Sequence, residues 1–220
     1  MSIDLLIREF HEVDWSRLEQ AHEAAAKVLP ALSDPVVLGG LWDRMAQDDA
    51  LAKGAESFNA FQKFLLHDDR ETGLRLRLHI FSEYMVEEAH NHRASFSSLI
   101  LHGSYRHFLY GNVEDVWGEE EQPATVVEPR FIQEQLPGTS YTLHHAFVHS
   151  TYATPGTVSL VVQGPRDRSS FRILDLAEGT TRTRLSGANV ADVQEPGERK
   201  LDRSELGGIR DHLVSLGLLV

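Results

Sequence analysis

The spacing of apolar residues changes once along the chain, from a helical period to a strand period. Before Gly73, apolar residues recur every three to four positions, which is typical of amphipathic helices. Within residues 74–80 they alternate strictly, so that the aliphatic side chains face one way and Arg75, Arg77 and His79 face the other. The pattern predicts an N-terminal helical segment over residues 1–72 that packs on a sheet domain over residues 73–186.

Three helices are expected in the N-terminal segment. The first follows Asp14, a candidate cap, and ends at Pro30. The second begins at Ser33-Asp34-Pro35, because Asp is a good cap and Pro is well tolerated in the first turn. The third covers residues 57–66. The apolar stripes of these helices are assigned to the core.

The sheet domain reads as a series of short strands separated by turn residues. Gly103, Gly111, Pro137-Gly138, Pro155-Gly156 and Gly164-Pro165 supply the turns. Many short strands with regular turn signals predict a sandwich or barrel. The expected strands cover residues 74–80, 95–101, 105–110, 125–133, 140–151, 157–163 and 171–176.

Two polar segments connect the predicted elements. Residues 112–123 are rich in Glu and Asp and are interpreted as a solvated loop, with a lid over a site as the alternative. Residues 187–220 comprise a polar linker over 187–203 and then an amphipathic helix that packs on the barrel. The apolar stripe of that helix consists of Leu206, Ile209, Leu213 and Leu216.

Composition excludes several classes of function. The chain has 220 residues, 41% of them hydrophobic, which is enough for one substantial core. Its formal net charge of -12 argues against binding to nucleic acid or an anionic membrane, because both need a positive surface. There is no cysteine, so histidine and carboxylate must supply any metal ligands. With no apolar run of membrane-spanning length and no signal-like start, a soluble, cytoplasmic protein is expected.

Histidines at strand-compatible spacing are the strongest chemical signal. His90 and His92 are two positions apart, so in a strand their rings project from one face and can share a metal ion. A third ligand is sought in residues 141–149, where alternation places Tyr141, His145 and His149 on one face. His145 is the expected third ligand, and His149 is held in reserve.

This arrangement resembles the cupin superfamily, whose barrel builds a metal site from two motifs. The first motif has a His-x-His pair, usually a Glu four or five positions later, and a closing Gly; here it is His90-Asn91-His92 running to Gly103. The second supplies a His with an Asn four positions on, and here these positions hold His145 and His149. The resemblance covers roughly residues 74–176 and implies an all-β cupin double-stranded β-helix, or jelly roll, with N-terminal helices and a C-terminal helix.

The carboxylate of the first cupin motif is missing, since no Glu or Asp occurs between His92 and Glu114. The chain therefore resembles the three-histidine branch, which includes cysteine dioxygenase and related thiol dioxygenases. That branch implies His90, His92 and His145 as the metal triad, with Val158-Ser159-Leu160 on a following strand. It also implies an arginine for the substrate carboxylate, for which Arg75 and Arg77 are both candidates.

The chain departs from cysteine dioxygenase on the later strand, which in that enzyme carries residues next to the iron and the substrate. That enzyme completes a Ser-His-Tyr network on the later strand, whereas this chain has Ser159, Val161 and Gln163. We therefore expect a mononuclear oxygenase that uses Fe(II) and O2 on a different small, anionic substrate. Zn, Mn, Ni and Cu remain open as metals, since imidazole binds them all. Tyr141 is expected to donate a hydrogen bond to a bound oxygen species.

Two other functions remain open. One is a metal cupin without redox chemistry, acting as an isomerase, lyase or hydrolase. The other is a cupin that binds a small ligand without catalysis. The superfamily resemblance also suggests a homodimer. His79, His102 and His107 are assigned to core or surface positions, with a role behind the metal ligands as the alternative. The carboxylate pairs Asp68-Asp69 and Glu87-Glu88 are assigned to exposed turns, with acid and base chemistry as the alternative.

Overall fold

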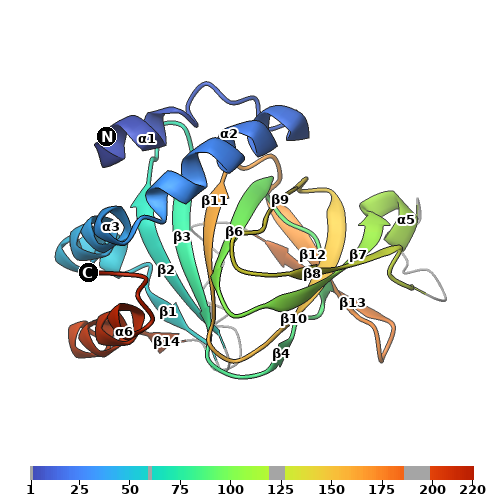
Figure 1. Ribbon diagram of the computed structural model, residues 1–220. Coiled ribbons are helices and arrows are strands. Elements are labelled where there is room, and N and C mark those ends of the chain that lie inside the picture. Colours follow the sequence, from blue (N-terminus) through green and yellow to red (C-terminus); the bar gives the residue numbers. More distant parts are fainter. Residues whose placement is uncertain (1, 59–60, 119–126, 186–198) are drawn as a thin grey trace.

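Two antiparallel β-sheets lie face to face, and helices cover the outer side of one of them (Figure 1). The computed structural model describes residues 2–58, 61–118, 127–185 and 199–220. The first sheet has the strand order β14-β1-β2-β3-β11-β6-β9. Its strands are β1 (Glu56–Ser57), β2 (Phe61–Asp68), β3 (Arg75–Phe81), β6 (Phe96–His102), β9 (Ser140–Leu143), β11 (Thr157–Gln163) and β14 (Arg199–Lys200).

The second sheet has the strand order β13-β12-β5-β10-β7-β8, and the short strand β4 also pairs with β10. Its strands are β4 (Met85–Val86), β5 (Ala89–His90), β7 (Tyr105–Asn112), β8 (Phe131–Gln135), β10 (Phe147–Ala153), β12 (Ser170–Asp175) and β13 (Thr180–Leu185). All pairings in both sheets are antiparallel.

The strand order identifies the fold as a jelly roll. Among the strands from β3 to β11, one sheet has the order β3-β11-β6-β9 and the other β5-β10-β7-β8. The last strand therefore lies beside the first, and successive strands alternate between the sheets except for the β7–β8 pair, as in two interlocked Greek keys. The expected all-β jelly-roll barrel with N-terminal helices and a C-terminal helix is confirmed.

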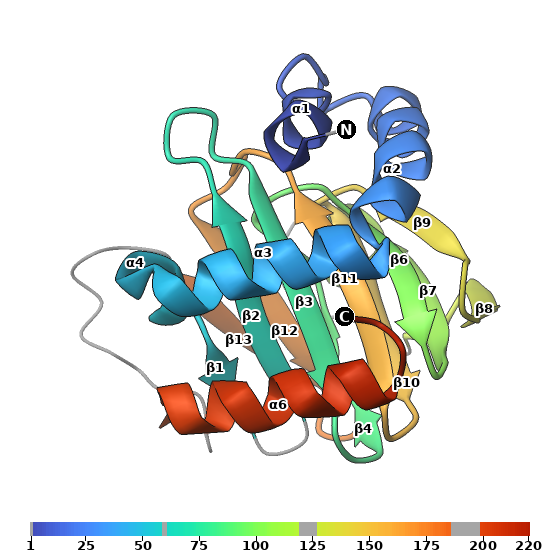
Figure 2. The same cartoon turned by 60° about the vertical axis from the view of Figure 1, so that its left-hand side comes forward.

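Helices α2, α3 and α6 lie against the outer face of the first sheet, and in Figure 2 α3 and α6 cross β2 and β3 side by side. Trp42 of α3 packs against Phe64 of β2 with 4.9 Å between the ring centroids, and Leu206 and Leu213 bury the terminal helix in the same core. The helices are α1 (Ile3–Arg8), α2 (Leu18–Leu32), α3 (Pro35–Gln47), α4 (Asp49–Ala52), α5 (Val113–Trp117) and α6 (Arg203–Ser215).

The structure corrects two predictions in the N-terminal segment. Residues 61–66, expected to be helical, belong to strand β2, which pairs along its whole length with β3. Over such a short run their apolar residues fit a helical period as well as a strand period. They form a strand because they pair with the edge of β3. Pro30 does not end its helix but lies within α2, near its last turn. The predicted start at Asp34 is confirmed, since its carboxylate accepts from the backbone N–H groups of Val36 and Val37.

The strand expected over residues 140–151 is also wrong, because it divides into β9 and β10 with a turn between them. The strand expected over 125–133 begins only at Phe131. Of the two polar segments, residues 119–123 of the acidic loop and 187–198 of the linker lie outside the described residues. Asn112, at the start of the acidic loop, instead caps α5.

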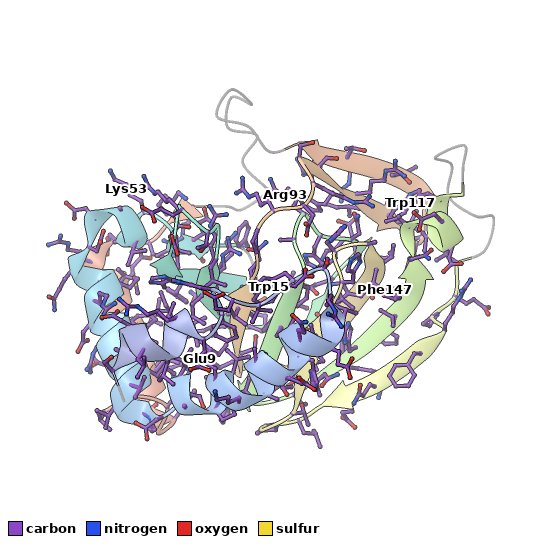
Figure 3. All side chains as sticks on the ribbon, turned by 90° about the horizontal axis from the view of Figure 1, so that it is seen from above. Glu9, Trp15, Lys53, Arg93, Trp117 and Phe147 are labelled. Atoms are coloured by element: carbon purple, nitrogen blue, oxygen red, sulfur yellow. The ribbon has the colours of Figure 1, made fainter. Side chains whose placement is uncertain are left out.

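Close packing between turns fixes the ends of the barrel. Gly103 has a φ of +70°, and a Cβ there would stand 2.6 Å from Thr157 Oγ1, so only glycine fits this turn. At Gly164 a Cβ would stand 2.3 Å from the ring of Trp15, which packs directly on this backbone. Figure 3 looks down on the molecule, with Trp15 labelled near its centre.

Within the described residues, no single helix is long and apolar enough to cross a membrane. Helices α2 and α3 pass that test only as a pair, by length and composition, and they are bent by 87° where they meet.

Candidate metal centre

His90, His92 and His149 form a compact cluster inside the barrel. Each offers a ring nitrogen, and these atoms lie within 4.8 Å of one another. His90 ends β5, His92 follows two positions later, and His149 faces His90 directly as its Cα partner on the neighbouring strand β10. The antiparallel pairing of β5 and β10 therefore also brings His149 beside His92, from which it is 57 positions away in the sequence.

The rings pack closely. The ring centroids of His90 and His92 are 4.8 Å apart, and those of His90 and His149 are 4.7 Å apart. His92 Nε2 lies 2.6 Å from His149 Nε2. Two nitrogens at this distance cannot both direct a proton at each other, so at least one of them presents its lone pair.

Hydrogen bonds behind the cluster orient two of the rings. His90 Nδ1 lies 2.8 Å from the carbonyl oxygen of Glu88, to which it donates. His149 Nδ1 lies 2.8 Å from Nε2 of the buried His107. Histidines that bind metals usually engage their second ring nitrogen in this way, because it fixes the tautomer and the ring plane. In His90 the lone pair is therefore on Nε2, which can bind an ion.

Burial keeps the imidazoles of His92 and His149 neutral. It lowers the pKa of His92 and of His149 well below the ordinary value, and the neighbouring His90 lowers both further. Burial and His90 also lower the pKa of His107, to about 4. A neutral imidazole carries the lone pair that a metal ion needs. Three imidazoles that converge from two adjacent strands are a donor set that fits a transition metal or zinc.

His145 is not part of this cluster, which corrects the predicted triad. It lies in the turn between β9 and β10, where its Nδ1 is 3.1 Å from an Asp167 carboxylate oxygen and its carbonyl oxygen accepts from the backbone N–H of His92. The turn breaks the alternation that had put His145 and His149 on one face. His149, the residue held in reserve, takes the place in the cluster.

Arg77 and Arg75, the two candidates for binding an anion, have different environments. Arg77 lines the cavity in front of the histidine cluster and donates to the Gln163 side-chain oxygen on β11. Within the described residues it forms no ion pair, and burial lowers its pKa to about 10. Arg75 is bound by Asp68, with Nε 2.7 Å from the carboxylate, and does not line the cavity. Arg77 is therefore the arginine that can receive an anion.

Tyr141 also lines the cavity, and its hydroxyl lies 2.6 Å from that of Tyr105 on β7. Burial raises the pKa of both hydroxyls well above the ordinary value, and the nearby charge of Glu87 raises them further. Both are therefore neutral, and one hydroxyl donates a hydrogen bond to the other. The pair joins the two sheets through a polar contact inside an apolar environment.

The cavity has a volume of about 110 Å³ and is lined from both sheets. Sequence reasoning missed three groups that contribute to it: Glu87, which was placed in an exposed turn, Tyr105 and His79. His107, for which a role behind the metal ligands was only the alternative, contacts His149. For His79 the sequence carried one signal, the face that it shares with Arg77 by alternation. The remaining lining residues are Phe81, Phe96, Ser98, Thr151, Ser159, Val161 and Gln163.

No protein-family model matches the chain, and no curated protein matches it. Several solved structures resemble it at low identity. KdgF from Halomonas sp. is 14% identical over 49% of this chain and 82% of its own, with a TM-score of 0.37. A cupin 2 conserved barrel domain protein from Rhodopseudomonas palustris is 15% identical over 53% of this chain and 68% of its own, with a TM-score of 0.39.

The polyketide cyclase RemF from Streptomyces resistomycificus is 20% identical over 57% of this chain and 77% of its own, with a TM-score of 0.38. Likeness at this level assigns neither an activity nor a substrate. The strand order and the histidine cluster stand on their own geometry.

Proposed function

We propose that the protein is a mononuclear metal-dependent enzyme of the cupin type, an oxygenase that uses Fe(II) and O2 on a small anionic substrate. One observation carries the proposal: three clustered histidines and a buried arginine without an ion pair in the described residues line the same cavity. The histidines supply ligands, and Arg77 supplies the charge that would draw an anion beside them.

Iron(II) bound by His90, His92 and His149 would supply the electrons that activate dioxygen. A set of three neutral ligands without a carboxylate leaves room for both an anionic substrate and dioxygen. Zn, Mn, Ni and Cu also suit imidazole ligands, so metal analysis is the first test of the proposal.

Arg77 would hold the substrate. A buried guanidinium is stabilised by an anion, and a carboxylate can accept two parallel hydrogen bonds from it. Gln163 holds one guanidinium nitrogen in place and leaves the others for the ligand. Phe96 and Val161 line the cavity close to this point and exclude water, which strengthens the interaction between the two charges.

Tyr141 and Tyr105 would keep a proton available in the cavity. Their raised pKa values mean that they donate hydrogen bonds and do not act as bases near neutral pH. A neutral phenol can stabilise negative charge that develops on a substrate oxygen. This role suits an oxygenase and also a reaction without electron transfer.

Glu87 favours a second candidate function, a lyase or isomerase in which the metal acts as a Lewis acid. It is a carboxylate in the same cavity as the tyrosine pair, so the cavity holds a base as well as proton donors. In that reaction Glu87 would accept a proton from the substrate while a tyrosine donates one.

Metal content and oxygen uptake distinguish these functions. Untagged protein would be purified without oxygen, its metals measured, and its oxygen consumption followed with Fe(II) and a panel of small carboxylic and thiol acids. Iron and acid-dependent oxygen consumption would support the oxygenase. Zinc without oxygen consumption would reject it in favour of the second candidate.

The variant H90A/H92A tests the site itself, with H145A as its matched control. Loss of metal in the double variant and its retention in H145A is the expected result. Unchanged metal content in the double variant would remove the basis of both catalytic functions and would leave a small-ligand-binding protein.

A further inference from the structure

The cavity carries two opposite charges that do not neutralise each other. Arg77 enters from β3 and Glu87 from the segment between β4 and β5 in the other sheet. Within the described residues neither side chain forms an ion pair, although 11 pairs of Lys or Arg with Asp or Glu occur elsewhere in that part of the protein. Opposite charges that line one small cavity and remain apart are suited to a ligand that also has two charges.

The surroundings of Glu87 are those of a cation site. Thr151 donates to its carboxylate at 2.5 Å, which holds the group in place without neutralising it. Phe81, Tyr105 and Tyr141 line the same cavity, with ring centroids 6.2 Å apart for Phe81 and Tyr105. Aromatic rings that share a cavity with a carboxylate can attract ammonium and other onium cations.

The surroundings of Arg77 are those of an anion site. Its single described hydrogen-bond partner is the uncharged Gln163, and Arg75 close by adds positive charge. The pKa of Arg77 is lowered by burial and by Arg75, and nearby acidic groups only partly oppose this. An anion bound here would relieve the repulsion between the two arginines.

We propose that the ligand of this cavity is a small zwitterion, with its carboxylate on Arg77 and an ammonium or other onium group on Glu87 and the adjoining aromatic rings. The inference rests on the proposed function, because this ligand is taken to be the substrate of the metal site. It narrows the substrate from a small anion to a small amino acid or betaine.

The test compares ligands that differ only in the cation. Binding of ω-amino acids with three to six carbons, of their trimethylammonium analogues and of the matched alkanoates would be measured by calorimetry, with metal-loaded and with chelator-treated protein. At least one zwitterion is expected to bind about ten-fold or more tightly than its alkanoate, since hydrogen bonds to a charged group are strong in a buried site.

Two variants assign the preference to Glu87. E87Q keeps the size of the side chain and an oxygen for Thr151, and it is expected to bind zwitterion and alkanoate equally. E88Q is the matched control, because Glu88 is the next residue but is exposed and paired with Arg182 on the outside of the barrel. It should keep the full preference.

Equal binding of zwitterions and alkanoates by the unchanged protein, or a preference that survives E87Q, would overturn the inference. These outcomes are separate from the fate of the proposed function. If the protein takes up no metal but binds zwitterions more tightly than alkanoates, only the enzyme proposal is rejected. If it takes up metal and oxygen but binds both ligands equally, only this inference is rejected.

Discussion

His149 lies directly opposite His90 across the antiparallel pair formed by β5 and β10, with 4.7 Å between the ring centroids. His145 lies only four residues earlier, but in the turn before β10, where it contacts Asp167. The strand pairing therefore selects which histidine completes the cluster.

The substitution H149A is expected to abolish tight metal binding, whereas H145A is expected to leave it within a few-fold of the unchanged protein. Losing one of three protein ligands removes a metal bond, and no other described histidine is part of the cluster. Competition with a chromogenic chelator would measure both affinities. Equal losses in the two variants would contradict the structural assignment.

His107 is expected to tune the centre without binding the ion. In H107F the His149 ring loses the partner of its Nδ1, so its orientation is no longer fixed. Metal affinity should fall by roughly 10–100-fold while the fold is retained. H102F is the matched control, because His102, the last residue of β6, contacts the Gly156 carbonyl and is not part of the cluster. Affinity loss in H102F as large as in H107F would mean a general effect on packing.

Glu56 should make stability depend on pH. Burial raises the pKa of this carboxyl, but ion pairs with Lys63 and Lys200, both at 2.6 Å, outweigh it and leave the pKa below the ordinary value. A carboxyl whose pKa is lower in the folded than in the unfolded protein stabilises the fold at any pH above the pKa of the unfolded state. This stabilisation is lost as the pH falls through the pKa of the folded state.

The variant E56Q should therefore be less stable than the unchanged protein by about 1 kcal/mol at pH 7, since the pair is only partly buried. The difference should shrink as the pH is lowered toward 3. Urea unfolding at pH 7, 5, 4 and 3 measures it. A difference that is constant over this range would show that the ion pairs do not stabilise the fold.

Gly103 should tolerate no side chain. In G103A the alanine would have to adopt a φ of +70°, and its Cβ would stand 2.7 Å from the Thr157 backbone. We therefore expect the free energy of unfolding to fall by roughly 2–4 kcal/mol. Gly138 also has a positive φ, of +85°, but no atom lies within 4 Å of its Cβ position. G138A should therefore lose only about 1 kcal/mol, for backbone strain alone. Similar melting temperatures for the two variants would show that the close contact with Thr157 relaxes without cost.

The sequence predicted the parts of the site whose signal is local. Strict alternation predicted β3 and a shared face for Arg77 and His79, and the spacing of His90 and His92 predicted that they share a face. Which face of β3 points into the barrel was not predicted. It could not predict Glu87 as a cavity residue, because the short segment around it has no periodicity of its own. Its position follows from pairing with β10, where the Glu87 backbone N–H donates to the Thr151 carbonyl.

By itself the sequence determined a β-rich barrel, its turns, the terminal helix and two of the three clustered histidines, since periodicity and turn residues act over a few positions. Tertiary structure alone decided that residues 61–66 join the sheet, that the chain turns at His145, and that His149 meets His90. Each of these depends on which strand edges pair. Pairing is a property of the whole sheet, because a backbone N–H or carbonyl group is satisfied only by a neighbour distant in the sequence.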